Sequence, residues 1–308
     1  MTYRSLFTVI AGALAAAALV AGPAPATPPG GDGRIVFSSA RDGNDEIYSM
    51  NQYGSALTRL TNHPGQDFNP SWKPFGSKIA FMRELDGTFD IWTMNLDGSG
   101  DENVTNNPAE DGDPAWSPDG SRIAFVSNRS GNNEVYLINP DGGGLTRLTF
   151  TSAYEFWPAW SPDGSKITFI SQRDGNNEVY VMNANGSAQS RRTFTSGRET
   201  HPSYSPDGAR IVFASDRSKT FEIWSMNENG TDWDRLTQNT CNFDFSPVYA
   251  PSGTRIVFTS CGKLAFMDVD GSDLTMSLEG GSPDWKPRIN IGPPPPPAPE
   301  PGPVCCWR

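Results

Sequence analysis

A repeat of about 44 residues constrains this chain more than any other feature of its sequence. An isoleucine recurs six times, each time at the start of a short apolar run. Successive copies lie 44 residues apart four times and then 45 residues apart, at Ile35, Ile79, Ile123, Ile167, Ile211 and Ile256. A fixed period of about 40 to 45 residues is typical of folds built from repeated supersecondary units. The chain is therefore expected to contain six similar units.

The clearest copy of the unit, residues 114–149, predicts four short strands joined by turns. Pro-Ala-Trp is the first strand. Ser-Pro-Asp-Gly follows as a tight turn, because proline fixes φ at its second position and glycine accepts a positive φ. Residues 122–127, 134–139 and 145–149 are expected to be the second, third and fourth strands. A four-stranded repeat of this length is typical of a blade of a β-propeller.

The two ends of the repeat predict how the ring closes. An aromatic residue ends the first strand of units two to six, at Trp72, Trp116, Trp160, Tyr204 and Tyr249. The first unit lacks this strand, but Ser-Pro-Asp-Trp-Lys-Pro at 282–287 repeats Asn-Pro-Ser-Trp-Lys-Pro at 69–74. We therefore predict an all-β, six-bladed β-propeller over residues 33–288, with four-stranded antiparallel blades and a C-terminal inner strand that completes blade 1. Such closure leaves no open sheet edge to promote aggregation.

The repeated motif also resembles a known family. The pattern x-Pro-x-Trp-Ser-Pro-Asp-Gly-Ser-(Lys/Arg)-Ile-x-Phe is followed by Glu-Ile-Tyr-x-Met-Asn-x-Asp-Gly and Arg-Leu-Thr. It is similar to the WD40-like repeat of TolB-type β-propellers over residues 33–287. The resemblance implies the fold, and it implies a role mainly in binding other proteins, although related propellers also occur beside peptidase domains. TolB carries an α/β domain before its propeller, so its partnership with an outer-membrane lipoprotein is not carried over.

The N-terminal segment predicts export. Residues 1–26 contain Arg4, an alanine-rich apolar run over residues 6–20, and Ala24-Pro25-Ala26 as a cleavage site, which is the pattern of a signal peptide. No later segment approaches the roughly 20 apolar residues of a spanning helix. We expect a protein that does not span the membrane and is secreted or periplasmic, within the cell envelope. The formal net charge of −11 argues against a nucleic-acid partner, because phosphate binding requires a basic surface.

Antiparallel pairing divides the connections of each blade between two faces. The loops after the second and fourth strands lie on one face, called here the loop face, and the Asp-Gly turns lie on the opposite turn face. On the loop face, an acid recurs three residues before the inner-strand proline, and this acid ring consists of Asp67, Asp111, Glu155, Glu199 and Asp244, with Gly280 in the sixth place. One residue before the proline the side chains vary, and these rim residues are Asn69, Asp113, Trp157, His201, Ser246 and Ser282.

The acid ring has two interpretations. Arginines follow the second strand at matching places, and a further acid precedes most third strands, so recurring ion pairs within blades explain the pattern as a structural one. The arginines are Arg41, Arg129, Arg173 and Arg217. Blades 2 and 6 have Leu85 and Gly262 at this place, which makes Asp67 and Asp111 the acids expected to be least neutralised. The alternative is that the acids line the mouth of the central channel and bind a divalent cation or a basic segment.

The rim residues are better candidates for recognition than the acid ring. Trp157 is expected to lie near further aromatic residues at Phe68, Tyr154, Phe156 and Phe245, and exposed aromatic surface favours a ligand or peptide. The alternative is that these rings pack the loops against one another. The only histidines, His63 and His201, show no ligand spacing, so no metal site is assigned.

The motifs favour a binding protein over an enzyme. The sequence has no Gly-x-Ser-x-Gly elbow, and no catalytic residue or cofactor is assigned. The leading hypothesis is a non-catalytic module that binds a protein or peptide partner through its loop face and channel mouth. The alternatives are a metal-dependent carbohydrate lyase or hydrolase that uses the channel-mouth acids with His201, and a structural or display element of the cell envelope.

The four cysteines fall into two pairs. Cys241 and Cys261 both fall on the loop face, so a disulfide between them is predicted, with two buried thiols as the alternative. The propeller itself is expected to be monomeric. Residues 289–308 form a proline-rich tail, which favours an extended polyproline spacer. At its end, Cys305 or Cys306 is available for an intermolecular disulfide, a bridge between the two neighbours, or no role at all.

Overall fold

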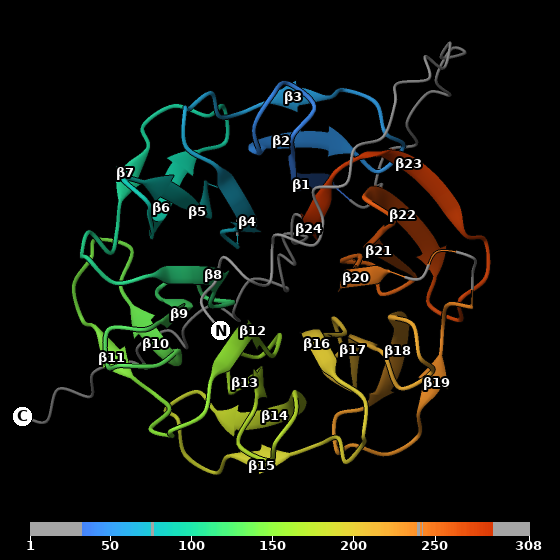
Figure 1. Cartoon of the computed structure of the whole chain (residues 1–308). Coiled ribbons are helices and arrows are strands. Elements are labelled where there is room, and N and C mark those ends of the chain that lie inside the picture. Colours follow the sequence, from blue (N-terminus) through green and yellow to red (C-terminus); the bar gives the residue numbers. More distant parts are fainter. Residues whose placement is uncertain (1–32, 75–76, 239–240, 242, 286–308) are drawn as a thin grey trace, which may run out of the picture.

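The computed structural model describes residues 33–74, 77–238, 241 and 243–285. The described residues form six four-stranded antiparallel sheets arranged in a ring around a central axis (Figure 1). The prediction of an all-β, six-bladed propeller is therefore confirmed. None of the described segments forms a helix with the length and apolarity needed to cross a membrane. The predicted signal peptide, residues 1–26, and the tail, residues 289–308, lie outside the described residues.

Each blade contributes one strand at each of four distances from the axis. The innermost strands of blades 1 to 6 are β24 (Gly281–Trp285), β4 (Asp67–Trp72), β8 (Asp111–Trp116), β12 (Glu155–Trp160), β16 (Glu199–Tyr204) and β20 (Asp244–Tyr249). The second strands are β1 (Arg34–Ser39), β5 (Lys78–Leu85), β9 (Ile123–Ser127), β13 (Lys166–Ser171), β17 (Arg210–Ser215) and β21 (Arg255–Ser260). The third strands are β2 (Glu46–Asn51), β6 (Thr88–Asn95), β10 (Glu134–Ile138), β14 (Glu178–Asn183), β18 (Glu222–Asn227) and β22 (Lys263–Asp268). The outermost strands are β3 (Thr58–Arg59), β7 (Glu102–Asn103), β11 (Thr146–Arg147), β15 (Ser190–Arg191), β19 (Asp234–Arg235) and β23 (Thr275–Glu279).

The ring is closed by the C-terminal strand, as the sequence predicts. β24 pairs antiparallel with β1, with Ile35 opposite Trp285. The neighbouring Asp284 reaches the next blade, because its carboxylate accepts from the backbone N–H of Trp72 at 2.7 Å and its carbonyl accepts from the indole Nε1 at 3.2 Å. Burial raises the pKa of Asp284 to about 7. The closing strand therefore completes blade 1 and also binds blade 2.

The hydrophobic core lies between the blades. Among the described residues, six apolar clusters form, and each takes its side chains from two neighbouring blades. Alternate residues of one strand enter different clusters: Ile79 and Phe81 of β5 face blade 1, whereas Ala80 and Met82 face blade 3. Since both faces of the second strand are buried, its sequence is a continuous apolar run rather than an alternating one. The isoleucine repeat reports this two-sided burial.

The inner strands are longer than the sequence predicts, and the outer strands of most blades are shorter. In blade 3 the predicted inner strand, Pro-Ala-Trp, begins earlier in the structure, at Asp111. The acid ring and the rim residues therefore belong to strands and not to the preceding loops. The predicted fourth strand, residues 145–149, is reduced to Thr146–Arg147, because only these two residues pair with β10. The acids and rim residues are consequently held by sheet hydrogen bonds close to the axis.

Candidate binding site at the loop face

The acid ring is buried. All five acids begin an inner strand, and each has no exposed surface. Three of them pair with the arginine that follows the second strand of their own blade, at 2.8 Å for Arg129 with Asp111, 3.2 Å for Arg173 with Glu155, and 3.7 Å for Arg217 with Glu199. In this arrangement the acids hold the second strand to the inner strand. Direct contact of these acids with a partner or cation stays a prediction.

The expectation that Asp67 is poorly neutralised is wrong. Arg83 lies within β5 and binds Asp67 through two hydrogen bonds, from Nε to Oδ1 at 2.8 Å and from Nη2 to Oδ2 at 2.9 Å. Its guanidinium also lies 5.0 Å from the ring centroids of Phe81 and Trp92. Paired donors in a planar fork match both carboxylate oxygens, which is the strongest geometry for an arginine and an acid. Asp111 is paired as well, through Arg129.

A second set of ion pairs holds the outer half of the blades. Acids that begin the third strand accept from arginines of the fourth strand, as in Glu134 with Arg147 at 2.8 Å and Glu222 with Arg235 at 3.0 Å. In blade 2, Asp90 instead accepts from the amide of Asn103 at 2.8 Å. The arginine of the repeated Arg-Leu-Thr therefore joins the fourth strand to the third within these blades.

Blade 6 replaces the arginine with a disulfide. Gly262 has no side chain to reach Asp244, and the hairpin between β21 and β22 is only two residues long. The structure joins Cys241 and Cys261, the pairing predicted from the sequence, at a sequence separation of 20. A bridge that closes a loop of this size contributes about 3 kcal/mol in the chain-entropy model. The disulfide thus secures the segment before β20 to the second strand of blade 6.

Burial changes the titration of the acid ring. It raises the pKa of Asp67, Asp111 and Glu155, and it raises that of Glu199 to about 8, with the negative charge of Glu178 as a further cause. Among the described residues, one carboxylate oxygen of each of Asp111, Glu155 and Glu199 has no hydrogen-bond partner. Thr195 and Ser215 both donate to the other oxygen of Glu199 at 2.9 Å. Glu199 is therefore the acid most readily held in its neutral form.

The rim residues share an unusual backbone. All six have a positive φ, between 46° and 54°. In all six inner strands the pairing register shifts at this place, for example between Phe156 and Ala159, which is the signature of a β-bulge. Left-handed backbone is uncommon for residues other than glycine and costs about 1 to 3 kcal/mol for a bulky side chain. The bulge turns each rim side chain out of the regular alternation of its strand.

The rim is polar on blades 2 and 3. The Asn69 amide donates to Asp113 Oδ1 at 2.8 Å, and the backbone N–H of Trp157 lies 3.3 Å from Asp113 Oδ2. Each of these contacts joins neighbouring blades. Asn69 is half-buried, whereas Asp113 is only 6% exposed. The bulged residues therefore interact with one another along the rim as well as with their own blades.

The rim is aromatic on blades 4 and 5. The indole of Trp157 stacks on the imidazole of His201, with 4.0 Å between ring centroids and an interplanar angle of 26°. His201 in turn meets Phe245 edge-on at 6.1 Å, and Phe156 supports Trp157 at 5.4 Å. Trp157 and His201 are half-buried. The rim thus presents an aromatic arc beside a polar arc, although all its residues share the same backbone conformation.

The TolB beta propeller domain profile matches this chain over residues 13–105, 69–158 and 153–290. Together these matches include all of the described ring. The chain belongs to the TolB β-propeller domain family. No curated protein sequence matches it.

Solved structures agree with a TolB-type propeller. The chain is 22% identical to TolB from Acinetobacter baumannii, with a TM-score of 0.73 and coverage of 84% of this chain and 68% of that chain. It is 25% identical to a putative TolB from Agrobacterium tumefaciens, with a TM-score of 0.65 and coverage of 81% and 90%. An oligogalacturonate lyase from Vibrio parahaemolyticus shares the fold at 14% identity, with a TM-score of 0.56 and coverage of 80% and 74%. The fold alone therefore accommodates both TolB and an enzyme.

The histidines of this TolB-type propeller lie apart. His201 is on the rim, where burial lowers its pKa to about 3, so the imidazole is neutral at physiological pH. His63 lies in the loop after β3, where its backbone N–H donates to Glu46 at 2.7 Å and its Nδ1 accepts from the N–H of Gly65 at 3.0 Å. Within the described residues, no three side chains of the His, Cys, Asp and Glu types converge as a metal site.

Proposed function

We propose that this TolB-type propeller is an exported, non-catalytic binding module that holds a segment of a protein partner against the rim residues on its loop face. The single observation that carries the proposal is the division of the rim into a polar arc and an aromatic arc. A structural requirement of the repeat would select the same side chain in each blade, as it does for the acid ring. At the rim, the chain keeps the strained backbone and changes the side chain.

The chemistry of the rim favours an aromatic or apolar side chain of the partner. Trp157 and His201 present stacked, half-buried rings, and such surfaces commonly anchor protein interfaces. A neutral imidazole also avoids the desolvation cost that a charged one would add on binding. The net charge of −11 favours a partner whose surface near the contact is basic, because opposite charge accelerates association.

Export is the second part of the proposal. The Cys241–Cys261 disulfide is a bond that persists mainly in oxidising compartments. The sequence pattern of residues 1–26 agrees with such a location, although these residues lie outside those the structure describes. We therefore place the propeller outside the cytoplasm, either secreted or in the periplasm.

The proposal is tested by partner capture with paired variants. The protein is cross-linked on native cells or envelopes, and the recovered partner is then titrated against purified propeller. Trp157→Ala is expected to weaken binding at least tenfold. A hot-spot residue typically contributes about 2 kcal/mol to the binding free energy. The control is Phe194→Ala, because Phe194 is 75% exposed on the same face but follows an outer strand. Equal affinity of the Trp157 variant and the original protein for the partner would contradict the proposal that the rim residues bind it.

A carbohydrate-active enzyme is the second candidate, and the shared fold with an oligogalacturonate lyase is the observation that favours it. Its weak point is His201, because a group with a pKa of about 3 is a poor general base at neutral pH. Turnover of an acidic oligosaccharide by the purified protein, abolished in His201→Ala, would support this candidate over binding alone.

A further inference from the structure

On the turn face, each of the six inner strands ends in an aromatic residue, and one of these residues differs from the rest in its exposure. The place beside such a residue, where its blade meets the preceding one, is called a notch here. Five of these residues are buried: Trp72, Trp116, Tyr204, Tyr249 and Trp285. The sixth, Trp160, is half-buried. It lies between blades 3 and 4, where a groove of about 530 Å³ opens beside it.

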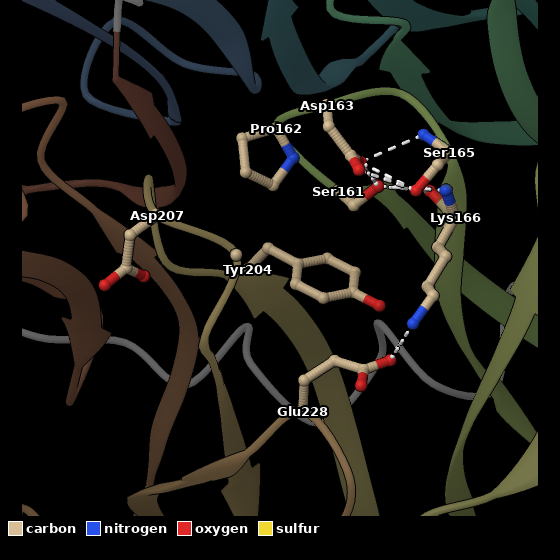
Figure 2. A pocket seen from close by; sticks show the side chains of 9 residues that line it. Ser161, Pro162, Asp163, Ser165, Lys166, Tyr204, Asp207 and Glu228 are labelled. Carbon is tan, nitrogen blue, oxygen red and sulfur yellow. Dashed lines mark hydrogen bonds and ion pairs between the residues drawn. The ribbon is translucent and has the colours of Figure 1, made fainter.

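Two of the notches with buried aromatic residues are covered by a lysine, and the notch at Trp160 lacks such a cover. Lys73 lies over the Trp116 ring, with Nζ 4.9 Å from the centroid. Between blades 4 and 5, Lys166 reaches across the notch to Glu228 at 2.9 Å, next to the Tyr204 hydroxyl (Figure 2). That notch contains only about 190 Å³. The cover in each case is a cation that extends over the aromatic ring or across the notch.

At Trp160 the equivalent groups point elsewhere or are missing. Arg122 occupies the place of Lys166, but it donates to the carbonyl of Gly144 at 2.9 Å in its own blade. Ala184 occupies the place of Glu228, so no acid is available across the notch. The Trp160 indole N–H already donates to the Ala115 carbonyl at 3.1 Å. The ring therefore offers apolar surface in a groove whose other apolar walls are Pro118, Leu137 and Leu148.

The chain itself supplies a segment suited to this groove. β24 begins on the loop face and ends at Trp285 on the turn face, so the last described residue of the ring lies on the same face as the groove. Residues 293–297 are five consecutive prolines, followed by Ala-Pro-Glu-Pro. Polyproline segments bind aromatic-lined grooves with little loss of entropy, because their backbone is already extended. Charged side chains of both signs also line the groove, namely Arg122, Asp119 and Asp163.

The length of the connection permits this contact. Trp285 ends β24 and Trp160 ends β12, and both strands are innermost strands of the ring (Figure 1). Residues 286–292 separate Trp285 from the first of the five prolines. Seven extended residues span up to roughly 23 Å. A tether of this kind also produces an effective concentration near the millimolar range, so a weak contact suffices.

We propose that residues 292–303 bind in cis in the turn-face groove between blades 3 and 4, with their prolines against Trp160. This inference is independent of the rim, because the two surfaces lie on opposite faces of the ring.

The test uses 5-fluorotryptophan and ¹⁹F NMR. Two proteins are compared, one with residues 27–308 and one that stops after residue 288, which keeps every described strand. Cys305→Ser and Cys306→Ser are included in the longer protein to exclude linked dimers. The Trp160 resonance, assigned with Trp160→Phe, is expected to differ between the two proteins. The Trp157 resonance, on the loop face, is the internal control and is expected to coincide.

Three results would overturn the proposal. The first is a Trp160 resonance that is the same in both proteins. The second is a resonance that keeps its full-length position after residues 293–297 are changed to serine, since the prolines would then not be the occupant. The third is a difference that disappears on dilution, which would assign the groove to the tail of a second copy. A difference that is lost in the serine variant and constant on dilution establishes the contact in cis.

Discussion

The acid ring and the rim residues lie two positions apart in the same inner strands, and they differ in every physical respect. The acids are nearly constant, have no exposed surface and are bound within their own blades. The rim residues vary, have a left-handed backbone and contact the neighbouring blades. A buried charge that loses its partner is costly, so every blade must satisfy it in a similar way. Four of the six rim residues are half-exposed and carry no such requirement, so their side chains are free to serve recognition: Asn69, Trp157, His201 and Ser282.

The largest expected effect comes from breaking the acid ring at its best-paired member. Arg83→Ala leaves the Asp67 carboxylate buried without its two hydrogen bonds, and removal of one partner from a buried pair costs about 3 to 5 kcal/mol. Urea denaturation measures this free energy of unfolding. The control is Arg198→Ala: its pair with Asp216 is equally short at 2.7 Å, but Arg198 is 62% exposed. That variant is expected to lose about 0 to 1 kcal/mol, and similar losses in the two variants would contradict the distinction.

A pH-dependent effect is expected at Glu199. Its pKa in the folded protein is about 8, above the ordinary value of 4.5, so the folded state retains a proton that the unfolded chain has released. The stability that this proton provides is complete below pH 4.5 and is lost as the pH rises through about 8, at up to about 1.4 kcal/mol per pH unit. Glu199→Gln keeps a neutral side chain at every pH. Between pH 5 and 9 the variant should therefore lose less stability than the original protein.

Asp163 provides the matched control for this titration. Hydrogen bonds from Ser161 and Ser165 lower its pKa to about 2, which is the opposite sign. The contribution of the Asp163 carboxylate to stability is present above its ordinary pKa of 3.8 and is lost only as the pH falls toward 2. Asp163→Asn is therefore expected to leave the change between pH 5 and 9 unaltered. If the free energy of unfolding changes with pH in the same way for Glu199→Gln and the original protein, Glu199 is ionised over the whole range from pH 5 to 9.

Features that recur in every blade could be predicted from the sequence, whereas a feature found in a single blade was missed. The six-bladed ring, its closure and the Cys241–Cys261 pairing follow from spacing, turn residues and sidedness. Arg83 was missed because blade 2 replaces the usual loop with a two-residue hairpin at Asp86 and Gly87, which have φ values of 50° and 87°. This hairpin extends β5 and places an arginine within the strand. An Asp-Gly pair between two apolar runs is a recognised signal for such a hairpin and would have identified it.

The rim conformation was not predictable from residue types. Trp157 and His201 are not residues that favour positive φ, and a residue before proline normally takes an extended backbone. The strain is imposed by the bulge, which depends on pairing across the sheet and not on local preference. The sequence therefore identified the rim positions by their variability, but it gave no indication that their side chains leave the strand alternation.

The smallest effect concerns this strain. Ser282 has a φ of 46° and a small side chain, so Ser282→Gly relieves the left-handed backbone while removing little packing. Relief of about 1 to 2 kcal/mol is opposed by about 0.4 to 1 kcal/mol of added freedom in the unfolded chain, which leaves a stabilisation of up to roughly 1 kcal/mol. Ser203→Gly is the control, because Ser203 of β16 pairs regularly with Val212 of β17. This variant should lose about 0.5 to 1 kcal/mol of stability. Thermal or urea unfolding of both variants measures the difference. If both glycine variants are destabilised equally, the positive φ stores no strain, and the rim backbone differs from the rest of the inner strand in shape alone.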